Sequence, residues 1–309
     1  MIENYRQWCQ FIQSVRSFFL QQGYLEVQTP RLVACPGTEP SLDVFSTEFQ
    51  MGRRRQKFYL PTSPELHAKK LICRGFTHIF DLGPCFRNGE ISEKHQPEFT
   101  MLEWYEVGGS LKSLQEMIQK LLSYLQRGQT QSIPVVTMAE LFQQHFQFDL
   151  TPQTSFQQLL QLCHASEVET HSSDSWDDLF YRLYLKRIEP SFQKYPALFV
   201  TDYPPSQAAL ARCNDQGWAQ RFELFIQGIE IANAFDELTD PLIQKDRFEK
   251  DLEEKLRLGK EAIPLDTEFL QDLQKGMPPT AGIALGVERL FMALHNYNSI
   301  RDFKYFTME

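Results

Sequence analysis

The alternation of apolar and polar positions predicts strands that are separated irregularly by helices. Apolar residues recur at helical spacing over 3–22, and Gly23 follows as a C-terminal cap. Alternating segments over 42–60 predict a hairpin with a basic tip at Arg53–Arg55. Further strands are predicted over 24–29, 77–86, 98–107, 196–204, 221–235 and 280–286. Further helices are predicted over 63–75, 110–126, 138–147, 175–189, 238–259 and 287–296.

This order of elements favours an α+β fold, an antiparallel β-sheet flanked by helices, because strands and helices do not alternate in a regular βαβ rhythm. Three local signals mark helix ends. Ser63 and Pro64 suit the start of one helix, Gly75 suits its end, and the pair Thr137 and Glu140 forms a capping box at another.

Composition narrows the class of protein. The chain has 309 residues, 42% hydrophobic and 23% charged, as in ordinary globular proteins. A net charge of −9 disfavours a protein whose main task is to grip nucleic acid. We expect no membrane span and no signal peptide, and hence a cytoplasmic protein. The six cysteines contain no C-x-x-C pair, which favours reduced, mostly buried thiols over a zinc site.

The segment FRNGEISEKHQPEFTMLEWY, residues 86–105, combines two apolar strands with a charged loop. Strand alternation places Phe99, Met101, Glu103 and Tyr105 on one face, which suits a cleft that receives a cation beside a flat group. Arg87 enters from the partner strand and can bind phosphate or carboxylate through two hydrogen bonds. A solvated surface hairpin explains the segment equally well.

A second group of polar residues lies in GIEIANAFDELTD, which contains Glu230, Asn233 and Glu237. Two carboxylates and an amide suit Mg²⁺ that shares its other ligands with phosphates. In a strand, Glu230 and Glu237 have opposite parity, so both face one site only with a bulge or strand end near Ala232. A solvated helical stripe is the alternative.

The C-terminal segment GIALGVERL places Gly286 at a strand end and Arg289 in the first turn of the next helix. A glycine and a helix N-terminus with an arginine favour an anion, although Arg289 could equally pair with a surface carboxylate. Glu65 begins its helix, where it also interacts favourably with the helix dipole. Together these groups suggest a nucleotide and an amine-bearing substrate.

GYLEVQTP, FRNGEISEKHQPEFTMLEWY and GIALGVERL resemble, in order, the three signature motifs of class II aminoacyl-tRNA synthetases. TSPELHAKKL and GIEIANAFDELTD resemble the lysyl-tRNA synthetase branch. The resemblance runs from about residue 10 to the C-terminus. It implies the catalytic fold of that family, a homodimer organised around the strand that ends at Pro30, and the use of ATP and Mg²⁺.

The resemblance also implies roles for individual residues. Arg87 and Arg289 would be the catalytic cations on ATP, with Phe99 and Arg289 on either side of adenine. Glu230 and Glu237 would bind the metal. The ATP site would comprise Arg87, Asn88, Gly89, His95, Gln96, Phe99, Glu230, Ile231, Gly286 and Arg289. The amino-acid pocket would comprise Ser63, Pro64, Glu65, Glu103, Tyr105, Asn233, Glu237 and Ala284.

Three departures from the synthetase pattern refine the expectation. The first motif begins about twenty residues in, so we expect one catalytic domain over 1–309 and no N-terminal anticodon-binding OB domain. YPPSQAALA and Ala284, where the synthetases usually have glycine, resemble paralogues that attach (R)-β-lysine to a lysine of elongation factor P. The family usually reads Arg-Asn-Glu, whereas Gly89 here moves the glutamate to Glu90.

Three functions stay open at this point. The resemblance favours a ligase that modifies elongation factor P, and tRNA is not expected as a partner. The alternatives are a lysyl-tRNA synthetase-like enzyme without an anticodon domain and a non-catalytic paralogue that binds an amino acid or a protein. The tip Arg53–Arg55 either contacts the acceptor protein or is a solvated turn.

Overall fold

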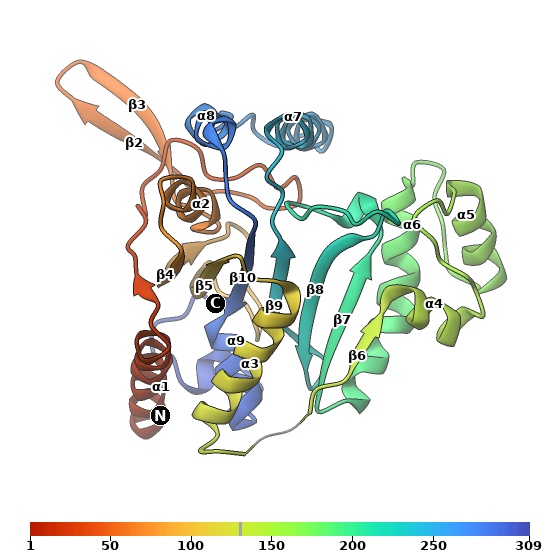
Figure 1. Cartoon of the computed structure of the whole chain (residues 1–309), viewed down its shortest axis with the longest axis horizontal. Helices are drawn as coiled ribbons and strands as arrows, with labels where there is room; N and C mark the ends of the chain where they lie inside the picture. The colour runs from red at the N-terminus through yellow and green to blue at the C-terminus, as the bar shows by residue number, and fades with distance from the viewer. Residues whose placement is uncertain (130–131) are drawn as a thin grey trace. The chain divides into compact units, whose positions relative to one another are not determined.

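A computed structural model describes residues 1–129 and 132–309. The chain forms two compact units, Met1–Thr130 with Glu237–Glu309, and Gln131–Asp236 (Figure 1). In the described part of the chain, no helix is both long enough and apolar enough to cross a bilayer.

The first unit holds the three motif segments. Its strands are hydrogen-bonded in the order β1-β4-β5-β10, with β4, β5 and β10 antiparallel and the short β1 parallel to β4. The strands are β1 (Leu25–Glu26), β4 (His78–Phe86), β5 (Glu98–Val107) and β10 (Thr280–Gly286). The helices are α1 (Ile2–Gln21), α2 (Glu65–Cys73), α3 (Leu111–Leu125), α7 (Pro241–Arg257), α8 (Thr267–Lys275) and α9 (Val287–His295), with a 3₁₀ turn at Ile300–Asp302.

The core of this unit lies on the face of β5 opposite the predicted site. Trp104 is fully buried and packs against Phe19 of α1, which also stacks on Phe80 of β4. Because side chains alternate along β5, burying Trp104 on one face leaves Glu103 and Tyr105 on the other.

The predicted hairpin forms a separate two-stranded sheet, β2 (Ser46–Met51) and β3 (Arg54–Tyr59), which projects from the first unit (Figure 1). Its tip is basic and exposed, and Arg55 pairs with Glu48 across the strands at 2.7 Å. Lys57 at its base pairs with Glu261 of the same unit.

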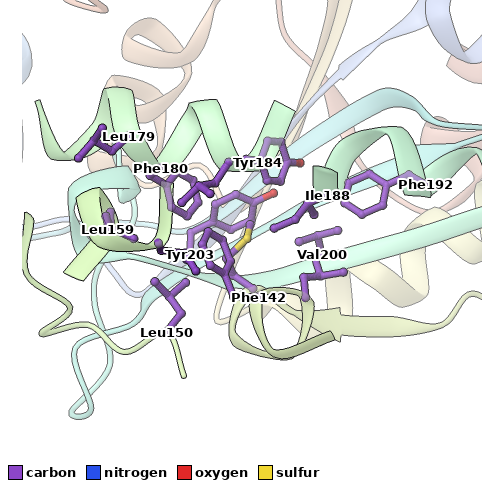
Figure 2. Close-up of a cluster of buried hydrophobic side chains, with 14 of the residues drawn as sticks. Phe142, Leu150, Leu159, Leu179, Phe180, Tyr184, Ile188, Phe192, Val200 and Tyr203 are labelled. Atoms are coloured by element: carbon purple, nitrogen blue, oxygen red, sulfur yellow. The ribbon is translucent and has the colours of Figure 1, made fainter. Parts of the chain in front are cut away.

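The second unit has its strands in the order β9-β8-β7-β6. They are β6 (Val135–Thr137), β7 (Ala197–Tyr203), β8 (Ala219–Ile226) and β9 (Ile229–Asp236), antiparallel except for the parallel pair β6–β7. Helices α4 (Met138–Phe146), α5 (Phe156–Ala165) and α6 (Trp176–Leu183) pack on β7 through a large apolar cluster that includes Phe142, Phe180 and Tyr203 (Figure 2). A π-helical turn spans Tyr184–Ile188, and 3₁₀ turns span Glu189–Lys194 and Pro205–Gln207.

The prediction of one long strand over 221–235 is wrong. Gln227 and Gly228 both have positive φ, 52° and 74°, and form a two-residue turn between β8 and β9. The predicted bulge near Ala232 is present: Leu224 pairs with Ala232 and Phe225 pairs with Glu230, which leaves Ile231 as the extra residue on β9.

Most other predicted elements are confirmed to within a few residues, but β1 covers only two residues of the predicted strand over 24–29. Helices α5 and α8 were not predicted. All six cysteines are free, but the prediction that most are buried is wrong, because only Cys85 and Cys163 are buried.

Candidate active site

Arg87 lies at the start of the loop between β4 and β5, and its guanidinium is incompletely hydrogen-bonded. Its Cζ lies 5.1 Å from the centre of the Phe99 ring. Its Nε is buried without a hydrogen-bond partner among the described residues, and its Nη1 lies 3.9 Å from Glu90 Oε2. A buried donor without a partner is costly, and an anionic oxygen would satisfy it.

Gly89 allows the loop to turn at this point. Its φ is +81°, in the region that side-chain-bearing residues avoid. Asn88 donates its backbone N–H to Asp43 O at 2.9 Å. The glycine therefore has a backbone role, and Glu90 one residue later lies within reach of Arg87.

The far end of the loop approaches α9 and the C-terminal segment. Arg289 and His95 are hydrogen-bonded side chain to side chain, and Ser92 contacts the other ring nitrogen of His95 at 2.7 Å. The Gln96 side chain accepts a hydrogen bond from Met308 N at 2.7 Å. The structure thus brings His95 to Arg289, whereas the Gln96 amide holds the C-terminal segment.

Glu103 is buried at the centre of a cluster of polar side chains, which we take as the candidate amino-acid pocket. Ser63 Oγ and Tyr105 Oη each donate to it at 2.7 Å. Ser63 Oγ also accepts from Glu65 N, the first amide of α2, but the helix begins at Glu65, so Pro64 occupies the N-cap position and Ser63 lies one residue before it. Burial foremost, and then the charge of Glu65, raise the pKa of Glu103 to about 8, against the opposing effect of the two hydroxyl donors.

Glu65 and Glu237 complete the pocket through a lysine that the sequence did not single out. Lys69 Nζ lies 2.5 Å from Glu65 Oε1 and 2.5 Å from Glu237 Oε2. Lys69 is fully buried, and burial alone would lower its pKa, but the charges of Glu237 and Glu65 raise it well above its usual value. Lys69 therefore stays an ammonium.

The β10 strand forms the wall next to Glu103. In the antiparallel register Gly282 lies opposite Tyr105, Ala284 opposite Glu103, and Gly286 opposite Met101. Directly opposed residues share a face, so the Ala284 methyl lies on the same side of the sheet as the Glu103 carboxylate.

We expect Gly282→Ala to damage the pocket. An added Cβ would lie 2.1 Å from Glu237 Oε1 and 2.6 Å from the Tyr105 ring, and both neighbours are buried. Overpacking of this kind costs about 1–3 kcal/mol, which denaturant unfolding measures. In the control Gly286→Ala the added Cβ would lie 3.7 Å from Arg289, so its loss of stability should be smaller. Equal stabilities for the two variants would contradict the prediction.

The second unit carries the remaining predicted residues, all on β9. Asn233 Oδ1 accepts a hydrogen bond from Arg221 Nε at 2.9 Å. Arg221 is buried, pairs with Glu223, and lies 4.5 Å from the centre of the Tyr203 ring. Because its oxygen accepts this hydrogen bond, the Asn233 side chain can offer its N–H groups to an acceptor. Glu230 lies on the same strand, and Ile231 is the buried bulge residue.

Sequence reasoning missed three residues of these sites. Lys69 and Arg221 are charged residues in amphipathic segments, and only the structure shows that they are buried. Glu39, on the loop before β2, lies near Glu65 and Arg87. Burial foremost, and then Glu65, raise its pKa, while Arg87 opposes the shift. No spacing rule links Glu39 to the motifs.

The profile of the family described as tRNA synthetases class II (D, K and N) matches residues 1–309. The chain therefore belongs to this family, and its fold is that of the class II catalytic domain. Three similar proteins carry the name elongation factor P--(R)-beta-lysine ligase. The one from Hamiltonella defensa is 32% identical over 100% of this chain and 96% of its own length. The one from Haemophilus influenzae is 34% identical over 97% and 94%, and that from Histophilus somni is 37% identical over 94% and 90%.

Proposed function

We propose that this protein is an ATP-dependent ligase that activates (R)-β-lysine as an aminoacyl-adenylate and transfers it to a lysine side chain of elongation factor P. The observation that carries the proposal is the group of Glu65, Glu103 and Glu237, of which Glu103 and Glu237 are buried, in a chain that also presents Arg87 over Phe99 and whose full-length relatives bear that ligase name. Carboxylates suit the amines of the substrate, and the guanidinium suits its carboxylate and a phosphate.

In this proposal the protein acts by positioning. Arg87 would orient the substrate carboxylate toward the α-phosphate of ATP and neutralise the charge that develops there, and Arg289 would bind the far end of ATP. Attack by the carboxylate forms the adenylate and releases pyrophosphate, so no general base is needed. The residues fit ATP, because Arg87 Nε is buried without a partner among the described residues.

Mg²⁺ would supply further charge neutralisation at the phosphates. Glu230 and Glu237 are the proposed protein ligands. In residues 1–129 and 132–309 no three His, Cys, Asp or Glu side chains gather as a metal site, so phosphates and water would provide the remaining ligands.

Ala284 supports the choice of the β-amino isomer. Its methyl lies on the Glu103 side of the sheet, where it removes space that glycine would leave. One methyl discriminates between substrates by about 1 kcal/mol or a little more, so Ala284 biases rather than fixes the preference.

Two assays test the proposal. We expect pyrophosphate exchange to be faster with (R)-β-lysine than with α-lysine, and labelled β-lysine to be transferred to elongation factor P. Equal or faster exchange with α-lysine would contradict the β-lysine assignment. Offering the acceptor protein and tRNA side by side separates the ligase from a tRNA-charging enzyme, and label on tRNA alone would reject the ligase.

The proposal also covers the domain content, the oligomeric state and the cellular location of the protein. Residues 1–309 would act as one catalytic domain, as a homodimer organised around the strand that ends at Pro30, in the cytoplasm. Contact of Arg53–Arg55 with the acceptor protein stays a prediction. Its test is transfer after all three arginines are neutralised, and unchanged transfer would reject it.

A further inference from the structure

Lys69 is a lysine of the protein within a pocket proposed to bind a lysine-like substrate. It is the fifth residue of α2, with none of its side chain exposed. Its Nζ lies midway between two carboxylates, at 2.5 Å from an oxygen of each. A buried ammonium is retained only where nearby charges compensate for the water it loses, and Glu65 and Glu237 provide that compensation.

The contact also determines how Glu237 is oriented. With Oε2 on Lys69, its Oε1 lies over Gly282, close to the Tyr105 ring, as the 2.1 Å separation from an added Cβ at Gly282 requires. Tyr105 donates to Glu103 at 2.7 Å. Lys69 thus directs Glu237 toward the side of the sheet on which Glu103 lies.

The net charge of the pocket is a second argument for a role of Lys69. Glu65, Glu103 and Glu237 contribute three negative charges when ionised, and Lys69 contributes one positive charge, which leaves two. A diamino acid brings two ammonium groups, whereas an amino acid with an apolar side chain brings one. An uncompensated buried charge is costly, so this count favours the diamino acid.

We propose that Lys69 is a positioning residue for amino-acid recognition, which orients Glu65 and Glu237 and sets the charge of the pocket to match two ammonium groups. This inference rests on the proposed function, because it assumes that these carboxylates receive the substrate amines.

Lys69→Met tests the inference because methionine keeps the length of the side chain and removes its charge. Lys70→Met is the matched control: Lys70 is also buried on α2 but pairs with Asp266 at 2.8 Å and Glu268 at 2.9 Å. We expect both variants to lose stability. Only Lys69→Met should raise KM for the diamino acid in pyrophosphate exchange, by about 10- to 100-fold.

A second pair of variants serves if Lys69→Met does not fold. Glu65→Gln with Lys69→Met removes one charge of each sign, and Glu65→Gln alone is its reference. Glu65→Gln alone leaves one net negative charge against two ammonium groups, whereas the double variant restores two, so we expect KM for the diamino acid to be about tenfold lower in the double variant. Equal KM values in this comparison, or equal effects of Lys69→Met and Lys70→Met, would overturn the inference alone. Wild-type protein without any diamino-acid-dependent exchange would overturn the proposed function together with it.

Discussion

Replacing Arg87 by methionine is expected to lower kcat/KM for pyrophosphate exchange by a factor on the order of 10²–10³, the usual cost of losing a donor that stabilises developing charge. The buried Nε of Arg87 lacks a partner among the described residues, and the guanidinium packs over Phe99. Methionine fills similar space but offers no donor. Because the same guanidinium would bind both the ATP phosphate and the amino-acid carboxylate, KM for ATP and KM for the amino acid should both rise.

Two further variants sharpen this test. Arg87→Lys keeps the charge but not the planar fork, so we expect it to recover only part of the activity. Arg74→Met is the control, since Arg74 lies on the surface of the same unit and pairs with Glu268 and Asp272 at 2.7 Å. It should leave exchange unchanged. An Arg87→Met enzyme with near-normal exchange would remove Arg87 from the proposed site.

The sequence predicts the first unit well because its elements have strong local signals. The loop between β4 and β5, the start of α2 and the glycine before α9 each depend on neighbours within a few residues. The turn between β8 and β9 was missed because Gln227, rather than Asn or Asp, occupies its first position of positive φ. Helix α5 carries a capping box at Ser155 that alone did not distinguish it from a polar loop.

The candidate site was predicted only in part, for a different physical reason. Family motifs identify Glu65, Glu103 and Tyr105, but they give no burial or partners. In the sequence Lys69 is one of two adjacent lysines on a helix, and only the ion pairs of the folded chain show that Lys69 meets Glu237 while Lys70 meets Asp266. The role of Gln96 in holding Met308 depends on residues 212 positions apart.

We expect amino-acid binding to strengthen as the pH rises from about 6 to about 8. The pKa of Glu103 is raised to about 8, so below that pH the free enzyme holds a proton that an incoming ammonium must displace. KM for the diamino acid should therefore fall by up to about tenfold per pH unit and level off near pH 8. The pKa values of Lys69 and Tyr105 both lie well above this range, so neither group should titrate within it.

Glu103→Gln isolates this effect, because glutamine keeps an oxygen for Ser63 and Tyr105 but cannot ionise. At pH 8 we expect KM for the diamino acid to rise by about 10- to 100-fold, and its dependence on pH between 6 and 8 to disappear. A variant that kept the wild-type pH profile would assign the titration to another group.

The pH dependence of the free energy of unfolding provides an independent measurement of the proton on Glu103. The folded-state pKa of Glu103 lies above its ordinary value of 4.5, so the folded protein binds a proton that the unfolded chain releases between pH 4.5 and about 8. The contribution of Glu103 to the free energy of unfolding is therefore fully present below pH 4.5 and is lost as the pH rises through about 8. Measured against Glu103→Gln, wild-type stability should fall by on the order of 1 kcal/mol per pH unit across this window. A constant difference between the two proteins would mean that Glu103 is already ionised at the lower pH, and amino-acid binding would then release no proton.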